Sequence, residues 1–175
     1  MSIARMMQMA AGASAGGVVW TDPDLANASY DSVSFSVSAQ ETDPSGIFFK
    51  PDGTKMYILG LTGDDVNEYD LSTAWDVTSA SYLQNFSVAA QETTPTGVFF
   101  KPYGTKMYVI GEAGGDVNEY DLSTAWDVSS ASYLQNFSVA AQGATPTGIF
   151  FKPDGSKMYV IGVAGDNTIY QYSTA

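Results

Sequence analysis

The chain carries an internal repeat of 51 residues, and this repeat limits the possible folds more than any other feature. Residues 41–91 and 92–142 are identical at 41 of 51 positions. A third unit begins at 143 and reaches Ser173-Thr174-Ala175, which corresponds to Ser72-Thr73-Ala74 of the first unit. Repeats of about 40–50 residues are typical of propellers and solenoids, in which each unit buries its apolar faces against its neighbours.

Each unit is expected to form four β-strands, because apolar, β-branched and aromatic residues gather in four short runs. In the second unit these runs are 96–101, 106–111, 116–122 and 133–139. The first two runs are separated by a glycine turn, in which glycine supplies a positive φ. Tyr103 stands in this turn where the other units have Asp52 and Asp154, a difference that we interpret as drift. The Ser/Thr/Ala-rich connection 123–132 is long enough for one helical turn, and no window has a sustained helical period.

The fourth strand of the third unit has a counterpart near the start of the chain. Residues 32–40 match 84–91 around Phe86 and Val88. The sequence therefore predicts an all-β protein, a β-propeller of four-stranded blades with three blades per chain and 32–40 as a displaced last strand. Propellers usually have about 4–8 blades, so we expect oligomerisation to complete the ring. A head-to-tail dimer is favoured, and an open stack capped by another protein is the alternative.

The repeat units resemble a known type of propeller repeat. Residues 146–162, PTGIFFKPDGSKMYVIG, and 116–124, DVNEYDLST, look like YVTN and lactonase-type repeats. This resemblance covers roughly residues 32–175. It implies the propeller fold, and it does not by itself imply an activity because one fold hosts many functions.

The composition excludes several kinds of site. The chain has no His and no Cys, which excludes a Ser-His-Asp triad, a cysteine nucleophile, disulfides and the usual zinc sites. With 19 Asp+Glu against 7 Lys+Arg, a net charge of −12 argues against a nucleic-acid partner. We expect no cofactor and no metal. Some oxygen ligands for calcium are present without EF-hand spacing, so turn and cap roles are favoured. They are Asp22, Asp24, Asn27, Asp64 and Asp65.

Residues 1–20 differ in composition from the predicted propeller segment, 21–175. They hold four of the seven methionines, the only arginine and no acidic residue. We interpret them as a Met/Ala/Gly-rich arm that binds assembly partners, while a disordered leader and a signal peptide are the alternatives. The arm is too short and too glycine-rich to span a membrane. The residues expected to carry the attachment are Arg5, Met6, Met7 and Met9.

Residues that recur in every unit are expected to serve the blade fold. The carboxylates at 68–70 and 119–121 could pair for glycoside hydrolysis, but their repetition favours solvated strand ends. Trp75 and Trp126 lie in the Ser/Thr-rich connections, where they either stack on a sugar or partner group or fill the space between blades. They are our binding candidates. The core between blades is expected to contain Tyr57, Tyr108 and Tyr159 together with the paired phenylalanines.

The arm followed by near-identical propeller repeats is similar to particle proteins of marine tailed phages. This resemblance implies a non-enzymatic structural component of the virion, in the head, tail or a fibre, or otherwise an extracellular or soluble protein. Its expected partners are a second copy, other virion proteins and host-surface glycans, so it would act in assembly or adhesion. The alternative is a lectin-like propeller that gains avidity through repeated grooves. A lactonase-type enzyme is the third possibility.

Overall fold

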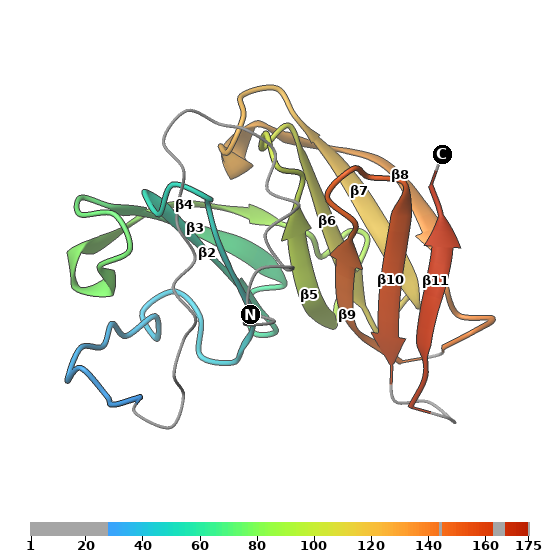
Figure 1. The fold of residues 1–175 in the computed structure, drawn as a ribbon, viewed down its shortest axis with the longest axis horizontal. Coiled ribbons are helices and arrows are strands. Elements are labelled where there is room, and N and C mark those ends of the chain that lie inside the picture. Colours follow the sequence, from blue (N-terminus) through green and yellow to red (C-terminus); the bar gives the residue numbers. More distant parts are fainter. Residues whose placement is uncertain (1–27, 144, 163–166, 175) are drawn as a thin grey trace, which may run out of the picture. The chain divides into compact units, whose positions relative to one another are not determined.

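The computed structural model of the chain describes residues 28–143, 145–162 and 167–174. The chain divides into two units, 1–32 and 33–175, and the second contains every strand described here (Figure 1). Among the described residues no helix has the length and apolar character needed to cross a membrane.

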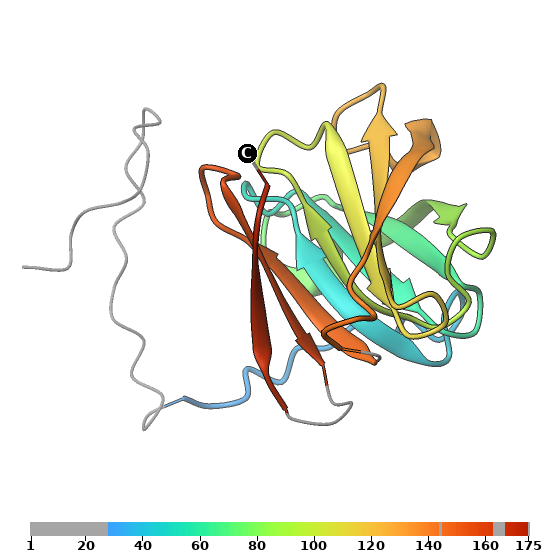
Figure 2. The same cartoon turned by 90° about the vertical axis from the view of Figure 1, so that its right-hand side faces the viewer.

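The described residues form three antiparallel sheets in which neighbours in sequence are neighbours in space (Figures 1 and 2). Blade 1 contains β1 (Pro44–Phe49), β2 (Lys55–Gly60), β3 (Asp65–Leu71) and β4 (Ala80–Ser87). Blade 2 contains β5 (Pro95–Phe100), β6 (Lys106–Gly111), β7 (Asp116–Leu122) and β8 (Ala131–Ser138). Blade 3 contains β9 (Pro146–Phe151), β10 (Lys157–Gly162) and β11 (Ile169–Ser173). The all-β propeller architecture with three blades is confirmed.

Glycine turns join the first two strands of each blade, as predicted. Gly53, Gly104 and Gly155 have φ values of 74°, 70° and 74°. In this region of φ a side chain is strained, which explains why each unit has glycine here. The turn of blade 1 is further fixed by Asp52, whose side chain accepts a hydrogen bond from the Thr54 backbone N–H at 3.0 Å.

The Ser/Thr-rich connections each contain a single 3₁₀ turn, Val77–Ser79 in blade 1 and Val128–Ser130 in blade 2. Aspartates cap both turns; in blade 2 the Asp127 carboxylate accepts from the Ser129 N–H at 2.9 Å. The predicted helical turn is therefore confirmed. The tryptophan just before each cap adopts a φ of 67°, a conformation that surrounding contacts must stabilise.

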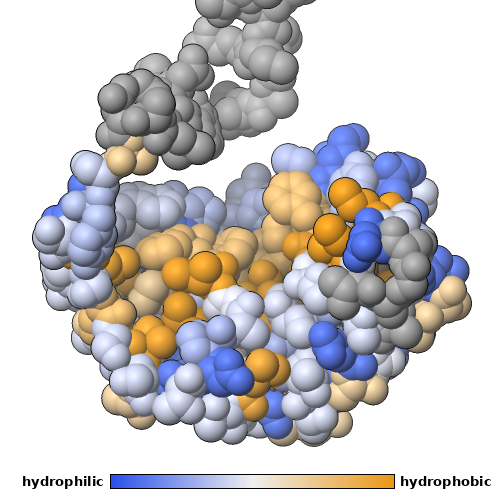
Figure 3. Space-filling view, turned by 90° about the horizontal axis from the view of Figure 1, so that it is seen from below, coloured by the Kyte–Doolittle hydropathy of each residue, from blue (hydrophilic) through white to orange (hydrophobic). Residues whose placement is uncertain are grey.

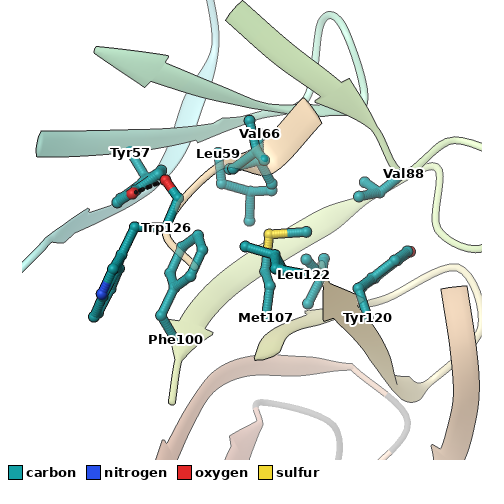
Figure 4. Close-up of a cluster of buried hydrophobic side chains, with 11 residues drawn as sticks. Tyr57, Leu59, Val66, Val88, Phe100, Met107, Tyr120, Leu122 and Trp126 are labelled. Atoms are coloured by element: carbon teal, nitrogen blue, oxygen red, sulfur yellow. Dashed lines mark hydrogen bonds between the residues drawn. The ribbon is translucent and has the colours of Figure 1, made fainter. Parts of the chain in front are cut away.

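The blades pack through their apolar faces, with β1 beside β5 and β5 beside β9. A cluster of buried side chains fills the space between blades 1 and 2 (Figure 4). Its centre is aromatic, because Tyr57 and Phe100 are almost fully buried and their rings lie 4.3 Å apart. The prediction that Tyr57 lies between blades is confirmed, while Tyr108 and Tyr159 are half-buried.

The displaced segment 32–40 is not a strand in the structure, although we expected one. Its packing is nevertheless that of a fourth strand: the ring of Phe35 meets Tyr69 edge-on at 5.6 Å. Phe137 of β8 meets Tyr172 of blade 3 in the same way, at 5.4 Å. The difference has a physical reason, because a strand requires a hydrogen-bonded neighbour and no described strand pairs with Val33–Val37.

Blade 3 shows the complementary feature. Its sheet has three strands in the order β11-β10-β9, so β11 lies at the edge of the sheet that the described residues form. In blades 1 and 2 the corresponding strand, β3 or β7, pairs on its outer side with β4 or β8.

Candidate binding site between the blades

A loop of blade 2 fills the space between blades 1 and 2, which we call the filled groove (Tyr57, Glu68, Gln84, Phe100 and the loop 126–128). The indole of Trp126 stacks on Phe100 at 5.8 Å and on Tyr57 at 6.4 Å. Only 9% of Trp126 is exposed, so this binding candidate fills space between blades. A Cβ on Gly104 would lie 2.4 Å from the indole, which is a second reason for glycine in this turn.

Three hydrogen bonds from blade 1 hold the backbone and cap of this loop. The Tyr57 hydroxyl donates to the Trp126 carbonyl at 2.7 Å, a bond drawn in Figure 4. The Glu68 carboxylate accepts from the Val128 N–H at 2.9 Å. The Gln84 amide donates to the Asp127 carboxylate at 2.6 Å. Because each bond comes from a different strand of blade 1, the loop is fixed in position and orientation.

The expectation that Glu68 is a solvated strand-end residue is wrong. Its side chain is fully buried. An ionised carboxylate can be buried when charge and hydrogen bonds compensate for lost water, and here Lys55 lies 2.5 Å away while Gln84 donates at 2.9 Å. Asp70, which shares Lys55, has a half-exposed side chain as expected. These carboxylates therefore form a structural ion-pair cluster.

The space between blades 2 and 3 is an open groove of about 720 Å³ (Tyr108, Glu119, Gln135, Phe151 and Gly155, with a rim of lysines). The position beside Gly155 is empty: a Cβ there would meet no atom within 4 Å among the described residues. At Gly104, the corresponding residue of blade 2, the tryptophan ring occupies this position. The open groove therefore corresponds to the filled groove, except that no described loop occupies the place that the loop 126–128 takes in the filled groove.

The side chains of the open groove have the same chemistry as those that hold the loop next door. Tyr108 and Phe151 lie 4.4 Å apart at 36°, close to the 4.3 Å and 34° of Tyr57 and Phe100. The Tyr108 hydroxyl makes only a long contact, 3.4 Å, with Glu119. Gln135 donates to the same carboxylate at 2.6 Å. The groove therefore presents a hydroxyl donor, a carboxylate and an amide around an aromatic floor.

Electrostatics keep these groups in fixed protonation states near neutral pH. Burial, followed by the nearby Glu119 charge, raises the pKa of Tyr108 to about 12, so its hydroxyl remains a donor. Burial also acts to raise the pKa of Glu119, but hydrogen bonds from Lys106 and Gln135 outweigh it and the net pKa lies below the usual value. Glu119 is thus an ionised acceptor.

Trp75, the second binding candidate, is 59% exposed. Its ring stacks on Phe49 at 5.5 Å and covers Gly53 of its own blade. Tyr103, which we interpreted as drift, is 79% exposed and lines the open groove. The structure thus separates the two tryptophans, since one lies in a filled groove and the other faces outward.

The remaining candidates do not assemble into a site. Asp65 is held by Asn67 and Asn85, whose amides donate at 2.5 Å each, and the described residues contain no cluster of three or more acidic groups suited to a metal. The arm residues Arg5, Met6, Met7 and Met9 lie outside the described residues, as do Asp22, Asp24 and Asn27.

Two buried glutamates were missed at the level of sequence. Glu41 accepts hydrogen bonds from the backbone N–H groups of Asp43 and Thr62 at 2.6 and 3.2 Å. Glu92 does the same in blade 2 with Thr94 and Ala113, at 2.8 and 3.0 Å. Their recurrence at the first position of two units was the available signal. They hold the β2–β3 and β6–β7 loops and are not part of the groove.

Comparisons with known proteins identify the fold. No family model and no curated protein matches the chain. Among solved structures, a protein of Bacteroides uniformis to which 6-phosphogluconolactonase activity is attributed matches 82% of the chain with 18% identity and a TM-score of 0.58. Hydrazine synthase of Kuenenia stuttgartiensis matches 93%, with 22% identity and a TM-score of 0.57. A periplasmic gluconolactonase of Pseudomonas aeruginosa matches 74%, with 17% identity and a TM-score of 0.52.

These neighbours correct one expectation from the sequence. We expected a chain without enzymatic activity, and this is contradicted by fold neighbours that include a gluconolactonase and proteins to which 6-phosphogluconolactonase activity is attributed. The chain spans only 41% and 36% of the first and last of the three structures described above. At this identity the chain shares with them the fold alone, which is part of a β-propeller.

Proposed function

We propose that the chain is a propeller segment that closes a ring with a second copy of itself and serves as an assembly or surface-adhesion module. One observation carries the proposal: β11 is an edge strand, while Phe35 already packs on blade 1 in the position of a fourth-strand phenylalanine. Edge strands pair readily with another chain. Pairing of Val33–Val37 from one copy with β11 of the other would complete blade 3 and join the two arcs.

The face of blade 1 that no other described blade covers supports the same arrangement. It carries a hollow of about 540 Å³ whose lining includes Phe35, Ile47 and Met56. Ile47 of β1 is 60% exposed. Figure 3 shows that hydrophobic side chains gather on a hollowed face of the molecule. Contiguous exposed apolar surface of this kind marks interaction sites, and a neighbouring blade would cover it.

Hydrogen exchange tests this proposal directly. Raising the protein concentration should slow the exchange of the β11 backbone amides, because pairing protects them, while β6 at the centre of blade 2 should be unaffected. Exchange of β11 that is independent of concentration would contradict closure by a second copy.

We further propose that the ring is a component of a phage particle, attached through residues 1–17. The support is the composition of this segment, with its methionines and single arginine, ahead of near-identical repeats. Mass spectrometry of purified particles should find the full chain and should not find a chain that lacks 1–17. Normal incorporation of the shortened chain would argue against the arm.

Glycan binding is the adhesion mode that the exposed tryptophan favours. The Trp75 ring is open on one side and can stack on a sugar face. On a glycan array, Trp75→Ala should abolish retention while Tyr103→Ala, which removes another exposed aromatic ring, should retain it. Equal retention by both variants and the unaltered chain would exclude Trp75 as the glycan site.

Lactone hydrolysis is the second candidate function, favoured by the fold neighbours. The open groove contains an ionised carboxylate, Glu119, which can act as a general base, and it is lined by Lys101, which can bind an anionic lactone. Hydrolysis of 6-phosphogluconolactone that Glu119→Gln removes would support this candidate. Absence of hydrolysis at all substrate concentrations would argue against it.

A further inference from the structure

We propose that the open groove is a socket for Trp20 of a second copy, so that the segment 20–37 of that copy supplies a loop and a strand that the described residues of blade 3 do not form. This inference rests on the proposed closure by a second copy, and it adds the residue that fills the groove. In the filled groove the chain itself shows what such a socket binds.

The filled groove binds a tryptophan followed by a backbone carbonyl and an N–H group. Tyr57 donates to the carbonyl, Glu68 accepts from the N–H two residues later, and Phe100 supports the indole. In the open groove the same roles fall to Tyr108, Glu119 and Phe151. Their aromatic pair is already in the same geometry, since Tyr108 and Phe151 differ from their counterparts by 0.1 Å and 2° (4.4 against 4.3 Å, 36° against 34°).

Elimination among the three tryptophans of the chain leads to Trp20. Trp126 is buried in the filled groove, and Trp75 stacks on its own blade over Gly53. Neither is available to cover Gly155, the glycine of blade 3 beside which the position is empty.

Two short motifs that follow Trp126 also follow Trp20, in the same order. After Trp126 the chain continues with Ala-Ser-Tyr at 131–133 and Phe-Ser-Val at 137–139. After Trp20 it continues with Ala-Ser-Tyr at 28–30 and Phe-Ser-Val at 35–37. The phenylalanine follows Trp126 by 11 residues and Trp20 by 15, so the second connection is longer and can span the same distance.

Position and charge agree with this assignment. In blade 2 the loop leads directly into β8, whose Phe137 packs on Tyr172 of the next blade. Phe35 packs on Tyr69 of blade 1 in the same way. The segment between Trp20 and Phe35 carries Asp22 and Asp24, and Lys101 lines the open groove, whereas Lys152 is already paired with Asp154 at 2.6 Å. Opposite charges of this kind fix the register of an interface.

Cysteine cross-linking tests the socket, because the chain has no cysteine of its own. We would mix the full-length Thr21→Cys variant with the full-length Tyr103→Cys variant, which places one thiol beside Trp20 and the other in the lining of the open groove. The matched control replaces Tyr103→Cys by Asp52→Cys, the corresponding turn position of blade 1. Under mild oxidation the first mixture should form the mixed disulfide dimer at least about ten times faster than the control.

Each outcome has a distinct meaning. A native dimer with the preferred cross-link supports the socket. A native dimer in which the two mixtures cross-link equally overturns the socket and leaves ring closure standing. A monomer at every concentration overturns both proposals, and a fast cross-link within one chain of the Thr21→Cys/Tyr103→Cys double variant would also overturn transfer between copies.

Removal of the indole gives an independent reading. Aromatic anchors dominate interface energetics, so Trp20→Ala should raise the dimer dissociation constant at least about tenfold, and Trp20→Phe should raise it less. An unchanged constant in Trp20→Ala would overturn the socket, as would lactone hydrolysis by the native dimer that depends on Glu119, because a filled groove excludes substrate.

Discussion

The two grooves between blades have nearly the same side chains and very different environments. In the filled groove Glu68 is fully buried and bonds to a backbone N–H of the inserted loop. In the open groove the side chain of Glu119 is 15% exposed, and its contacts are with its own blade. The difference comes from the inserted loop and not from the groove residues. A residue type repeated at a fixed period can therefore be structural in one copy and available for binding in the next.

The largest effect on stability is expected when the indole ring of Trp126 is removed from the filled groove. Trp126→Ala should lower the free energy of unfolding by about 3–5 kcal/mol, because it leaves a cavity between blades 1 and 2. Urea denaturation would measure it. Tyr103→Ala, at the exposed aromatic residue of the open groove, should change stability by less than about 0.5 kcal/mol, and equal losses would remove the distinction between the grooves.

The second largest effect is expected for the glutamates of the two grooves, whose removal should lower the free energy of unfolding by different amounts. Glu68→Ala removes one of the two carboxylate partners of half-buried Lys55 and the buried acceptor of the Val128 N–H, and it should cost about 3 kcal/mol. Glu119→Ala should cost about 1 kcal/mol, because solvent screens the remaining charge. Denaturation midpoints of the two variants, measured side by side, test this order. A larger loss for Glu119 would show that the open groove depends on its ion pair as strongly as the filled groove does.

Removal of the tyrosine hydroxyl groups of the two grooves should give a smaller difference in the free energy of unfolding. Tyr57→Phe leaves the buried Trp126 carbonyl without its donor and should cost about 1–2 kcal/mol. Tyr108→Phe removes only a 3.4 Å contact and should cost less than about 0.5 kcal/mol in the monomer. In a dimer formed through the socket, the Tyr108 hydroxyl would bond to the inserted segment, so Tyr108→Phe should cost more stability. The loss of stability should therefore increase with protein concentration for Tyr108→Phe and not for Tyr57→Phe.

An alkaline titration tests the burial of the tyrosines by a spectroscopic signal. Burial raises the pKa of Tyr69 and of Tyr108 to about 12, above the value of about 10 in an unfolded chain. Their contribution to stability is therefore complete below pH of about 10 and is lost as the pH rises towards 12. Absorbance of tyrosinate against pH should show a late phase that Tyr108→Phe reduces, and a single phase near pH 10 would contradict the burial.

Much of the fold could be predicted from the sequence because its determinants are local. The runs of apolar residues set the strands, and the turn glycines at 53, 104 and 155 set the hairpins. The prediction for 32–40 differed from the structure because a strand depends on a neighbour as well as on its own residues. The local pattern could identify the segment and could not supply the partner.

The grooves could not be predicted in the same way, because they arise where residues from two blades meet. Gln84 and Asp127 are 43 positions apart and become hydrogen-bonded partners only in the packed structure. The burial of Glu68 follows from the same packing, which explains why a solvated position was expected for it. The interpretation of Tyr103 as drift is incomplete for the same reason, because this residue lines the open groove.

Light scattering of the purified full-length chain tests the central claim most directly. Closure by a second copy predicts a native mass of about 37 kDa, twice the chain mass of 18.6 kDa, and a lower mass on dilution of Trp20→Ala than of the unaltered chain. A mass of 18.6 kDa at every concentration would contradict the account.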